Sequence, residues 1–548
     1  MGNSLDHLFK GKEVEGRRIE TKYGPVIGKR IINDKDKEVD AFLGIPFAKP
    51  PIGELRFQKP VPPDSWTEPR RCFKFASRSI QKDMFFWQKY SLMDTSEDCL
   101  YLNVFAPVNG PSSDFPKGYP VMVFIHGGGF VCDSSVKYGD IGISKHLVSD
   151  KGVIVVTIQY RLGYLGFFST GDDVCPGNNG LWDMTLALKW IQNNIPNFGG
   201  DKDNVTIFGQ SAGGCAVELL ALSPHSQHLF HKIIPMGGNS QCNWSLNKKV
   251  VEICYNFATK HGIFTRDSKD LLNELRNLPA NKFGTSLQLS TSDISAIAKP
   301  TTEIGPRIDG DFLPESLEKL QKKSIPKPKI IGLCEAEGLI FQLFMKTHHV
   351  GKLEDIIATI IPETDFPNFK ELRSKALKLY MSEDFDNKSK GLFNRQVGKF
   401  FSDLFVGIGT KLSILRCIES GVEPYVYIFE HFNPKQFGIL SLKIPYKAAT
   451  HCWDISYVVK VGIVVNWEFT KEDLIIVDYM TTFWANFAKY GNPNGINESN
   501  VPVQWEPATK DNPNRCLRIK LEPEMSETFF DNTSDFWLEL DKYKNLSN

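Results

Sequence analysis

The sequence predicts an α/β protein whose large, mostly parallel central sheet is covered by helices on both faces. Short, uninterrupted apolar runs, such as VMVFI at 121–125 and VIVVTIQY at 153–160, alternate with helical segments. Strands that are apolar at every position are typical of parallel sheets buried on both sides. Glycine-rich motifs directly follow two of the runs, at the strand ends where such sheets gather their reactive groups.

The expected elements alternate along the chain. Strands are expected at 121–125, 153–160, 205–208, 232–236, 329–333 and 425–429. A helix is expected at 179–195, where apolar residues recur at helical spacing, and another begins near residue 212. Near the C-terminus, apolar residues at 476, 480, 483 and 487 follow the pattern i, i+4, i+7, i+11 and predict an amphipathic helix.

No internal repeat, low-complexity tract or long flexible linker divides the 548 residues. We therefore expect one domain at 14–540 between short tails at 1–13 and 541–548. The chain has 64 basic and 64 acidic residues, a balance that gives no support to nucleic-acid binding.

The targeting features of the sequence favour a cytoplasmic protein. The first 18 residues are polar and lack the apolar core of a secretory signal, and no uncharged apolar run is long enough to span a membrane. A weak N-terminal lipid anchor at Gly2 stays an alternative, although Asp6 stands where the myristoylation motif has Ser or Thr. The oligomeric state is left open.

The cysteines do not form a recognisable framework. Eleven cysteines, an odd number, are spread over a long chain, which excludes a dense set of disulfides. No Cys-x-x-Cys or Cys/His cluster has the spacing of a zinc site. We therefore expect no metal and no cofactor.

The segment FGQSAGG at 208–214 contains the pattern G-x-S-x-G directly after an apolar run. By chance this pattern occurs about 0.2 times in a chain of this length, so the surrounding residues must support it. A strand that turns at once into a helix holds its serine in a strained conformation, and side chains at the flanking glycines would clash. This context predicts Ser211 as a nucleophile, with the N–H of Ala212 as a donor to an oxyanion.

Other parts that a nucleophilic serine needs are also present. HGGG at 126–129 follows a buried strand and matches the element that supplies oxyanion donors in lipases and esterases. In these hydrolases an acid and then a histidine follow the serine along the chain. Glu335 and Glu337 lie just past a predicted strand, and His451 lies further on in AATHCWDISYV.

At this point the chain resembles the type-B carboxylesterases, the family of cholinesterases and liver-type esterases. EDCLYLNVFAP at 97–107 and FGGDKDNVTIFGQSAGG at 198–214 are similar to its signature segments, and the resemblance extends over about residues 14 to 540. It implies an α/β-hydrolase fold. By position it also implies a catalytic triad of Ser211, Glu337 and His451, and an oxyanion hole formed by Gly128, Gly129 and Ala212.

The resemblance also implies structural features around the site. Arg56, Glu97 and Arg161 stand where the family has buried ion pairs that hold loops. Cys72 and Cys99 keep the spacing of a family disulfide, and both the disulfide and a pair of free thiols stay open.

The implied activity is hydrolysis of a small-molecule carboxylic ester through an acyl-enzyme on Ser211. Gln210 stands where cholinesterases have Glu, which favours neutral over cationic substrates, and Gly237 replaces a serine that is frequent in the family. Two alternatives stay open. One is transfer of the acyl group to an alcohol, sugar or amine, and the other is a binding protein that keeps the fold without catalysis.

Overall fold

The computed structural model describes residues 14–33, 36–83, 93–111, 113–287, 298, 302–344, 350–381, 390–496, 501–530 and 533–540. Gly2 and the tails expected at 1–13 and 541–548 lie outside these residues.

The centre of the molecule is one large sheet, which has 13 strands within the described residues and a mostly parallel core. Its strands follow in the spatial order β1 (Val14–Thr21), β2 (Gly24–Ile32), β3 (Glu38–Pro46), β7 (Tyr101–Pro107), β9 (Ile154–Ile158), β8 (Tyr119–Ile125), β10 (Gly200–Gln210), β11 (Lys232–Met236), β12 (Ile330–Cys334), β13 (Tyr425–Phe429), β14 (Cys516–Ile519) and β15 (Glu524–Ser526). β4 (Arg70–Cys72) adds to β2, while β5 (Arg78–Ser79) and β6 (Thr95–Ser96) pair separately.

The direction of the strands changes across the sheet. From β9 to β14 every neighbouring pair is parallel, whereas β1, β2, β3 and β7 form an antiparallel extension at one edge and β15 adds an antiparallel strand at the other. The core is the parallel sheet expected from the apolar runs. The antiparallel extension was not expected from the sequence.

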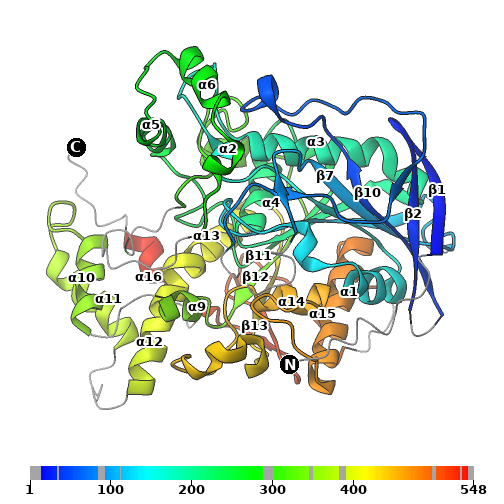
Figure 1. Ribbon diagram of the computed structural model, residues 1–548. Helices are drawn as coiled ribbons and strands as arrows, with labels where there is room; N and C mark the ends of the chain where they lie inside the picture. The colour runs from blue at the N-terminus through cyan, green and yellow to red at the C-terminus, as the bar shows by residue number, and fades with distance from the viewer. Residues whose placement is uncertain are drawn as a thin grey trace.

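Alternate side chains of each central strand pack into different cores. In β8, Val121, Val123 and Ile125 join one cluster, and Met122 and Phe124 join the cluster on the opposite face. Helices α3 (Asn179–Asn194) and α4 (Ala212–Leu222) cover the first face, and α14 (Trp453–Val459) and α15 (Lys471–Tyr490) cover the second (Figure 1). Both faces are therefore buried, as continuous apolar strands require.

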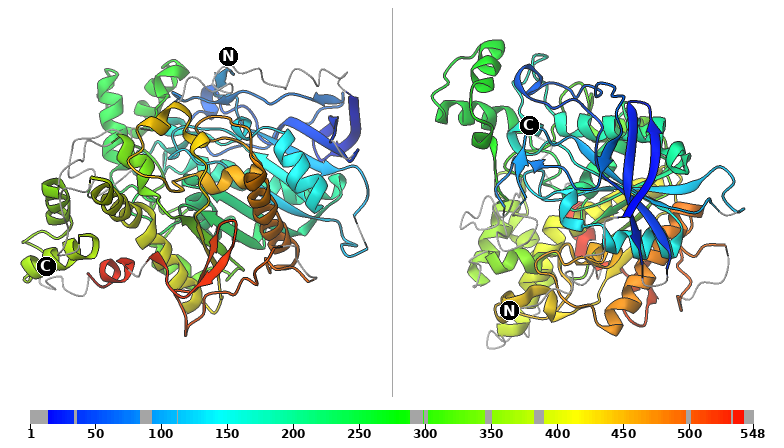
Figure 2. Two further views of the ribbon diagram at one scale, coloured as in Figure 1. Left: turned by 90° about the horizontal axis from the view of Figure 1, so that it is seen from below. Right: turned by 45° about the vertical axis from the view of Figure 1, so that its right-hand side comes forward.

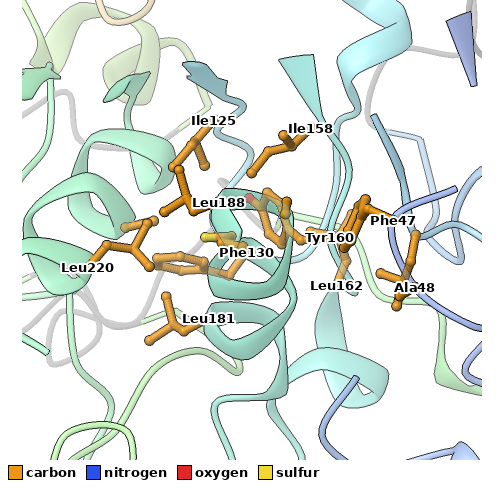
Figure 3. Close-up of a cluster of buried hydrophobic side chains, with 14 of the residues drawn as sticks. Phe47, Ala48, Ile125, Phe130, Ile158, Tyr160, Leu162, Leu181, Leu188 and Leu220 are labelled. Atoms are coloured by element: carbon orange, nitrogen blue, oxygen red, sulfur yellow. The ribbon is translucent and has the colours of Figure 1, made fainter. Parts of the chain in front are cut away.

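Figure 3 shows part of the first cluster. Ile125 at the end of β8 lies beside Leu188 of α3, and Leu181 of α3 and Leu220 of α4 lie around Phe130. The end of β8 is thus packed against a helix that covers this face.

A third core lies over the β12–β13 side of the sheet. Ile331, Leu333, Val426 and Ile428 pack there against helices at one end of the molecule, away from β1 and β2 (Figure 2). These helices are α10 (Val350–Ile360), α11 (Phe369–Tyr380), α12 (Lys390–Ser402), the π-helix η9 (Asp403–Gly407), α13 (Ile408–Glu419) and α16 (Thr533–Glu539).

A buried carboxylate ties this group of helices together. Asp403 accepts hydrogen bonds from Tyr380 Oη at 2.7 Å, from Thr533 Oγ1 at 2.5 Å and from Ser534 Oγ at 3.2 Å. Burial raises the pKa of Asp403 to about 6, even though the three hydroxyl groups favour the ionised form.

The other α-helices within the described residues have no more than eleven residues each. They are α1 (Ile141–Ile143), α2 (Gly163–Phe167), α5 (Val250–Lys260), α6 (Ser268–Arg276), α8 (Leu317–Lys323) and α9 (Gly338–Phe344). None of the helices in the described ranges has both the length and the apolar content that crossing a bilayer requires.

Candidate active site

Ser211 lies at the turn where β10 ends and α4 begins. Its backbone has φ 59° and ψ −125°, a region that L-residues seldom adopt. A methyl group at Gly209 would lie 2.6 Å from the carbonyl carbon of Gly213, and one at Gly213 would lie 2.1 Å from the carbonyl oxygen of Ile125. Both glycines of G-x-S-x-G are therefore required by close packing, and the nucleophile turn predicted from the sequence is present.

The three predicted triad residues are brought together. His451 Nε2 lies 2.8 Å from Ser211 Oγ, and His451 Nδ1 is hydrogen-bonded to Glu337 Oε2. The other carboxylate oxygen of Glu337 accepts the backbone N–H of Cys334 at 2.7 Å. Since a carboxylate accepts from Nδ1–H, the neutral imidazole presents an unprotonated Nε2 to the serine hydroxyl.

The loops that carry the acid and the base are held together by an isolated β-bridge. Ala336 pairs with Thr450, and the N–H of Ala336 donates to the carbonyl oxygen of Ala449 at 2.9 Å. Glu335 instead accepts the N–H of Ala449 at 3.1 Å, and burial raises the pKa of Glu335 to about 7. Of the two acids that the sequence offered, Glu337 is therefore the one that contacts His451.

The environments of the three side chains differ. Glu337 is fully buried, whereas Ser211 and His451 are partly exposed. Burial alone would lower the pKa of His451, but interactions with the neighbouring Cys452 side chain and with the Glu337 carboxylate outweigh it and raise this pKa well above the usual value. The Glu337 carboxylate thus stabilises the imidazolium that His451 would become after it accepts a proton as a general base.

The HGGG segment passes directly over the nucleophile turn. A methyl group at Gly127 would lie 2.5 Å from the carbonyl oxygen of Gln210 and 3.1 Å from Ser211 Cβ. Gly128 has φ +90° and Gly129 has φ +62°, so both need the left-handed freedom of glycine. Within the described ranges, the amides of Gly128, Gly129 and Ala212 donate no hydrogen bond to another protein group, which leaves them available for a substrate oxygen.

Several residues that hold this loop were not predicted from the sequence. Tyr160 Oη donates to the carbonyl oxygen of His126 at 2.9 Å, and its ring stacks on the imidazole of His126. Gln81 holds the far end of the loop through two hydrogen bonds to the backbone of Asp133. Burial lowers the pKa of His126 to about 4, so this histidine is a neutral structural residue. No local sequence signal marks these contacts.

The predicted ion pairs are present, with one unpredicted partner. Arg56 binds Glu97 through two hydrogen bonds of 2.6 and 2.7 Å and also donates to the carbonyl oxygen of Leu278 at 2.7 Å. Arg161 pairs with Asp183 of α3, at 2.8 and 2.6 Å. The sequence pointed to Arg161 but not to Asp183. Both pairs are buried, and each fixes the two chain segments that it joins.

The sequence left open whether Cys72 and Cys99 form a disulfide or stay free thiols. In the structure both are free, buried thiols. Burial raises the pKa of each to about 12. Such thiols are protonated and unreactive near neutral pH.

Two aromatic side chains lie beside the base. The ring of Phe341 is 5.4 Å from the imidazole of His451 and 4.6 Å from the ring of Phe405, measured between centroids. Phe405 belongs to the π-helix η9, which joins α12 directly to α13 along the chain. This side of the site is therefore apolar.

A serine, a histidine and a buried carboxylate, hydrogen-bonded in series at a turn between strand and helix, define a serine hydrolase with the α/β-hydrolase fold. Comparison with known proteins agrees. The sequence profile of the carboxylesterase family matches residues 15–537, and the chain belongs to this family. It is therefore a serine carboxylic ester hydrolase.

Individual relatives align over most of the chain. Esterase cest-33 of Caenorhabditis elegans is 37% identical over 563 aligned residues, which cover 100% of this chain and 98% of the relative. Liver carboxylesterase 1 of Oryctolagus cuniculus is 32% identical and covers 95% and 93% of the two chains. Cocaine esterase of Homo sapiens is also 32% identical, with coverage of 94% and 90%.

Proposed function

We propose that the chain hydrolyses neutral carboxylic esters through an acyl-enzyme on Ser211. The observation that carries this proposal is the continuous relay from Ser211 Oγ through His451 to Glu337. A serine hydroxyl is a weak nucleophile until a neighbouring base accepts its proton, and the relay supplies that base.

The reaction follows from this geometry. Ser211 Oγ attacks the ester carbonyl carbon while its proton moves to His451 Nε2. The negative charge on the carbonyl oxygen is stabilised by the amides of Gly128, Gly129 and Ala212. The bond to the alcohol oxygen then breaks, and the alcohol leaves with the proton from His451. Water attacks the acyl group, gives its proton to His451, and the carboxylic acid departs as the serine is reprotonated.

The residues around the nucleophile favour a neutral, apolar ester. Gln210 carries no charge, and its side chain binds Cys452 rather than facing open space. Phe341 and Phe405 offer an apolar wall next to His451. Burial of an apolar acyl or alcohol chain against such a wall stabilises binding by about 25 cal/mol per Å².

The test combines a chromogenic ester with replacement of the nucleophile. The wild-type protein is expected to hydrolyse p-nitrophenyl butyrate, and Ser211→Ala is expected to lose about 10⁶-fold in kcat. A fluorophosphonate should label Ser211 alone, as read by peptide mass spectrometry. Equal turnover by both proteins would refute the proposal.

The same assay separates hydrolysis from acyl transfer, since both use the acyl-enzyme. Hydrolysis predicts steady release of butyric acid in water. A burst of nitrophenol that becomes steady only when an alcohol, sugar or amine is added would show that transfer is the reaction.

The cysteines also bear on the proposed compartment, the cytoplasm. All eleven are free thiols, which suits a reducing environment. Fractionation of cells that produce the full chain would test this. Recovery in a secretory or membrane fraction would contradict it.

A further inference from the structure

A second contact joins the two catalytic segments. Gln210 precedes the nucleophile and Cys452 follows the base, and the Cys452 thiol donates to Gln210 Oε1 at 3.0 Å. Gln210 is only 2% exposed, and Cys452 is the one partly exposed cysteine of the eleven. The turn of Ser211 and the loop of His451 are therefore tied by this bond as well as by their own.

Gly237 lies at the centre of the polar atoms of the relay. It has φ +53°, and its N–H donates to the carbonyl oxygen of Gly332 at 2.8 Å. A methyl group at this position would lie 3.1 Å from Gln210 Nε2, 3.2 Å from Glu337 Oε1 and 3.5 Å from His451 Nδ1. The amide of Gln210 and the acid–base pair thus face the same side of this glycine.

The thiol determines which end of the amide faces the relay. Because the S–H group donates to Oε1, the NH₂ group of Gln210 faces Gly237 and the Glu337 carboxylate. In the opposite orientation a carbonyl oxygen would face a carboxylate oxygen, which is repulsive. Nε2 is buried and, within the described residues, has no hydrogen-bond partner. Its N–H groups are therefore not committed to another acceptor, and their dipoles act on the neighbouring Glu337 carboxylate.

We infer that Cys452 and Gln210 are positioning residues, in which the thiol orients the amide toward Glu337 across Gly237 and holds the nucleophile turn in register with the loop of the base. This inference rests on the proposed acyl-enzyme on Ser211. Both residues act through the relay, so their loss lowers the rate of acylation and leaves substrate binding unchanged.

The test uses four variants, each changing one part of the contact. Cys452→Ala removes the donor, Cys452→Ser keeps a donor, Gln210→Met keeps the length of the side chain without its polar atoms, and the fourth combines Cys452→Ala with Gln210→Met. Cys452 has φ +73°, and alanine and serine keep its Cβ, so backbone strain is the same in all three.

With p-nitrophenyl butyrate, Cys452→Ala is expected to lower kcat about 5-fold with KM unchanged, the loss of one neutral hydrogen bond. Cys452→Ser should recover kcat to within about 2-fold of wild type. Gln210→Met should lower kcat at least as much, and the double variant should be no worse than Gln210→Met, because the two residues act as a unit. The rate of fluorophosphonate labelling should follow kcat.

Cys516→Ala is the matched control, because this thiol also donates to an oxygen, that of Thr528 at 3.5 Å, but lies in β14. It should keep the wild-type kcat. Melting temperatures identify any variant that folds poorly. Wild-type kcat in both Cys452→Ala and Gln210→Met would overturn the inference, and so would a double variant whose loss is the product of the single losses. An active Ser211→Ala would instead overturn the proposed function, so the two failures are distinguishable.

Discussion

Replacing Glu337 with glutamine would reverse the hydrogen-bonding role of one atom in the relay. In the native protein Glu337 Oε1 accepts the N–H of Cys334 at 2.7 Å, while Oε2 binds His451 Nδ1. A glutamine has only one oxygen, and the Cys334 N–H requires it at the Oε1 position. The NH₂ group must then face His451 Nδ1, which forces the imidazole proton onto Nε2. That nitrogen can no longer accept the proton of Ser211.

We therefore expect Glu337→Gln to lower kcat about 10⁴-fold, the loss seen when the acid of a triad becomes an amide. This corresponds to about 5.5 kcal/mol of transition-state stabilisation. The assay is steady-state hydrolysis of p-nitrophenyl butyrate, with KM expected to stay within about 3-fold because Glu337 is buried behind the histidine.

The matched control for this experiment is Glu335→Gln. Glu335 is a neighbouring buried carboxylate that binds the N–H of Ala449 and not His451. Its kcat should stay within about 3-fold of wild type. A loss below 10-fold in Glu337→Gln, or an equal loss in both variants, would refute the assignment of the acid.

Further predictions concern the oxyanion loop, a buried ion pair and two titrating groups. Gly128→Ala should lower kcat at least about 10²-fold, since the methyl group would lie 2.1 Å from a backbone oxygen and displace the loop. Asp183→Asn leaves Arg161 buried without its counter-charge and should lower the free energy of unfolding in urea by about 3–5 kcal/mol. The acidic limb of kcat/KM should have its midpoint above pH 6.5, because His451 must be neutral to act and its pKa is raised. The folded state holds a proton on Asp403 up to about pH 6, above the ordinary value of 3.8, so stability should fall as pH rises between these values. Asp403→Asn should make this fall less steep, while Glu335, whose pKa is also raised, keeps part of it.

Each of these expectations has an outcome that contradicts it. An active Gly128→Ala would show that the loop tolerates a side chain. Asp203→Asn is the control for the ion pair, since Asp203 is exposed and pairs with exposed Lys202, and its urea midpoint should match wild type. An acidic limb below pH 6.5, or a stability curve of Asp403→Asn that parallels wild type, would contradict the two pH predictions.

The parallel core could be predicted from the sequence because fully apolar strands leave few alternatives. The expected strands at 232–236 and 425–429 have the same ends as β11 and β13. β10 begins at Gly200, five residues before the expected strand, because Gly200 pairs with Tyr119 of β8; the polar residues 201–204 lie within a register shift between this pair and Val205. The antiparallel strands β1 to β3 carry mixed polar and apolar residues, so their own sequences do not predict strands. They form strands because they pair with one another.

Within the site, the local motifs predicted the nucleophile and the oxyanion loop because the chemistry and the chain geometry both lie within a few residues. The acid and the base needed the family resemblance, since Glu335 and Glu337 are alike in sequence and the chain has eleven histidines. Asp183 and Tyr160 could not be predicted, because their roles arise from contacts between distant segments.

The backbone of Ser211 has a further consequence. A glycine would adopt its conformation without strain, so folding alone would favour glycine at this position, where chemistry demands the hydroxyl. Selection for thermal stability therefore favours glycine at position 211, whereas selection for catalytic turnover favours serine. A directed-evolution experiment that selects only for thermal stability would therefore enrich inactive variants.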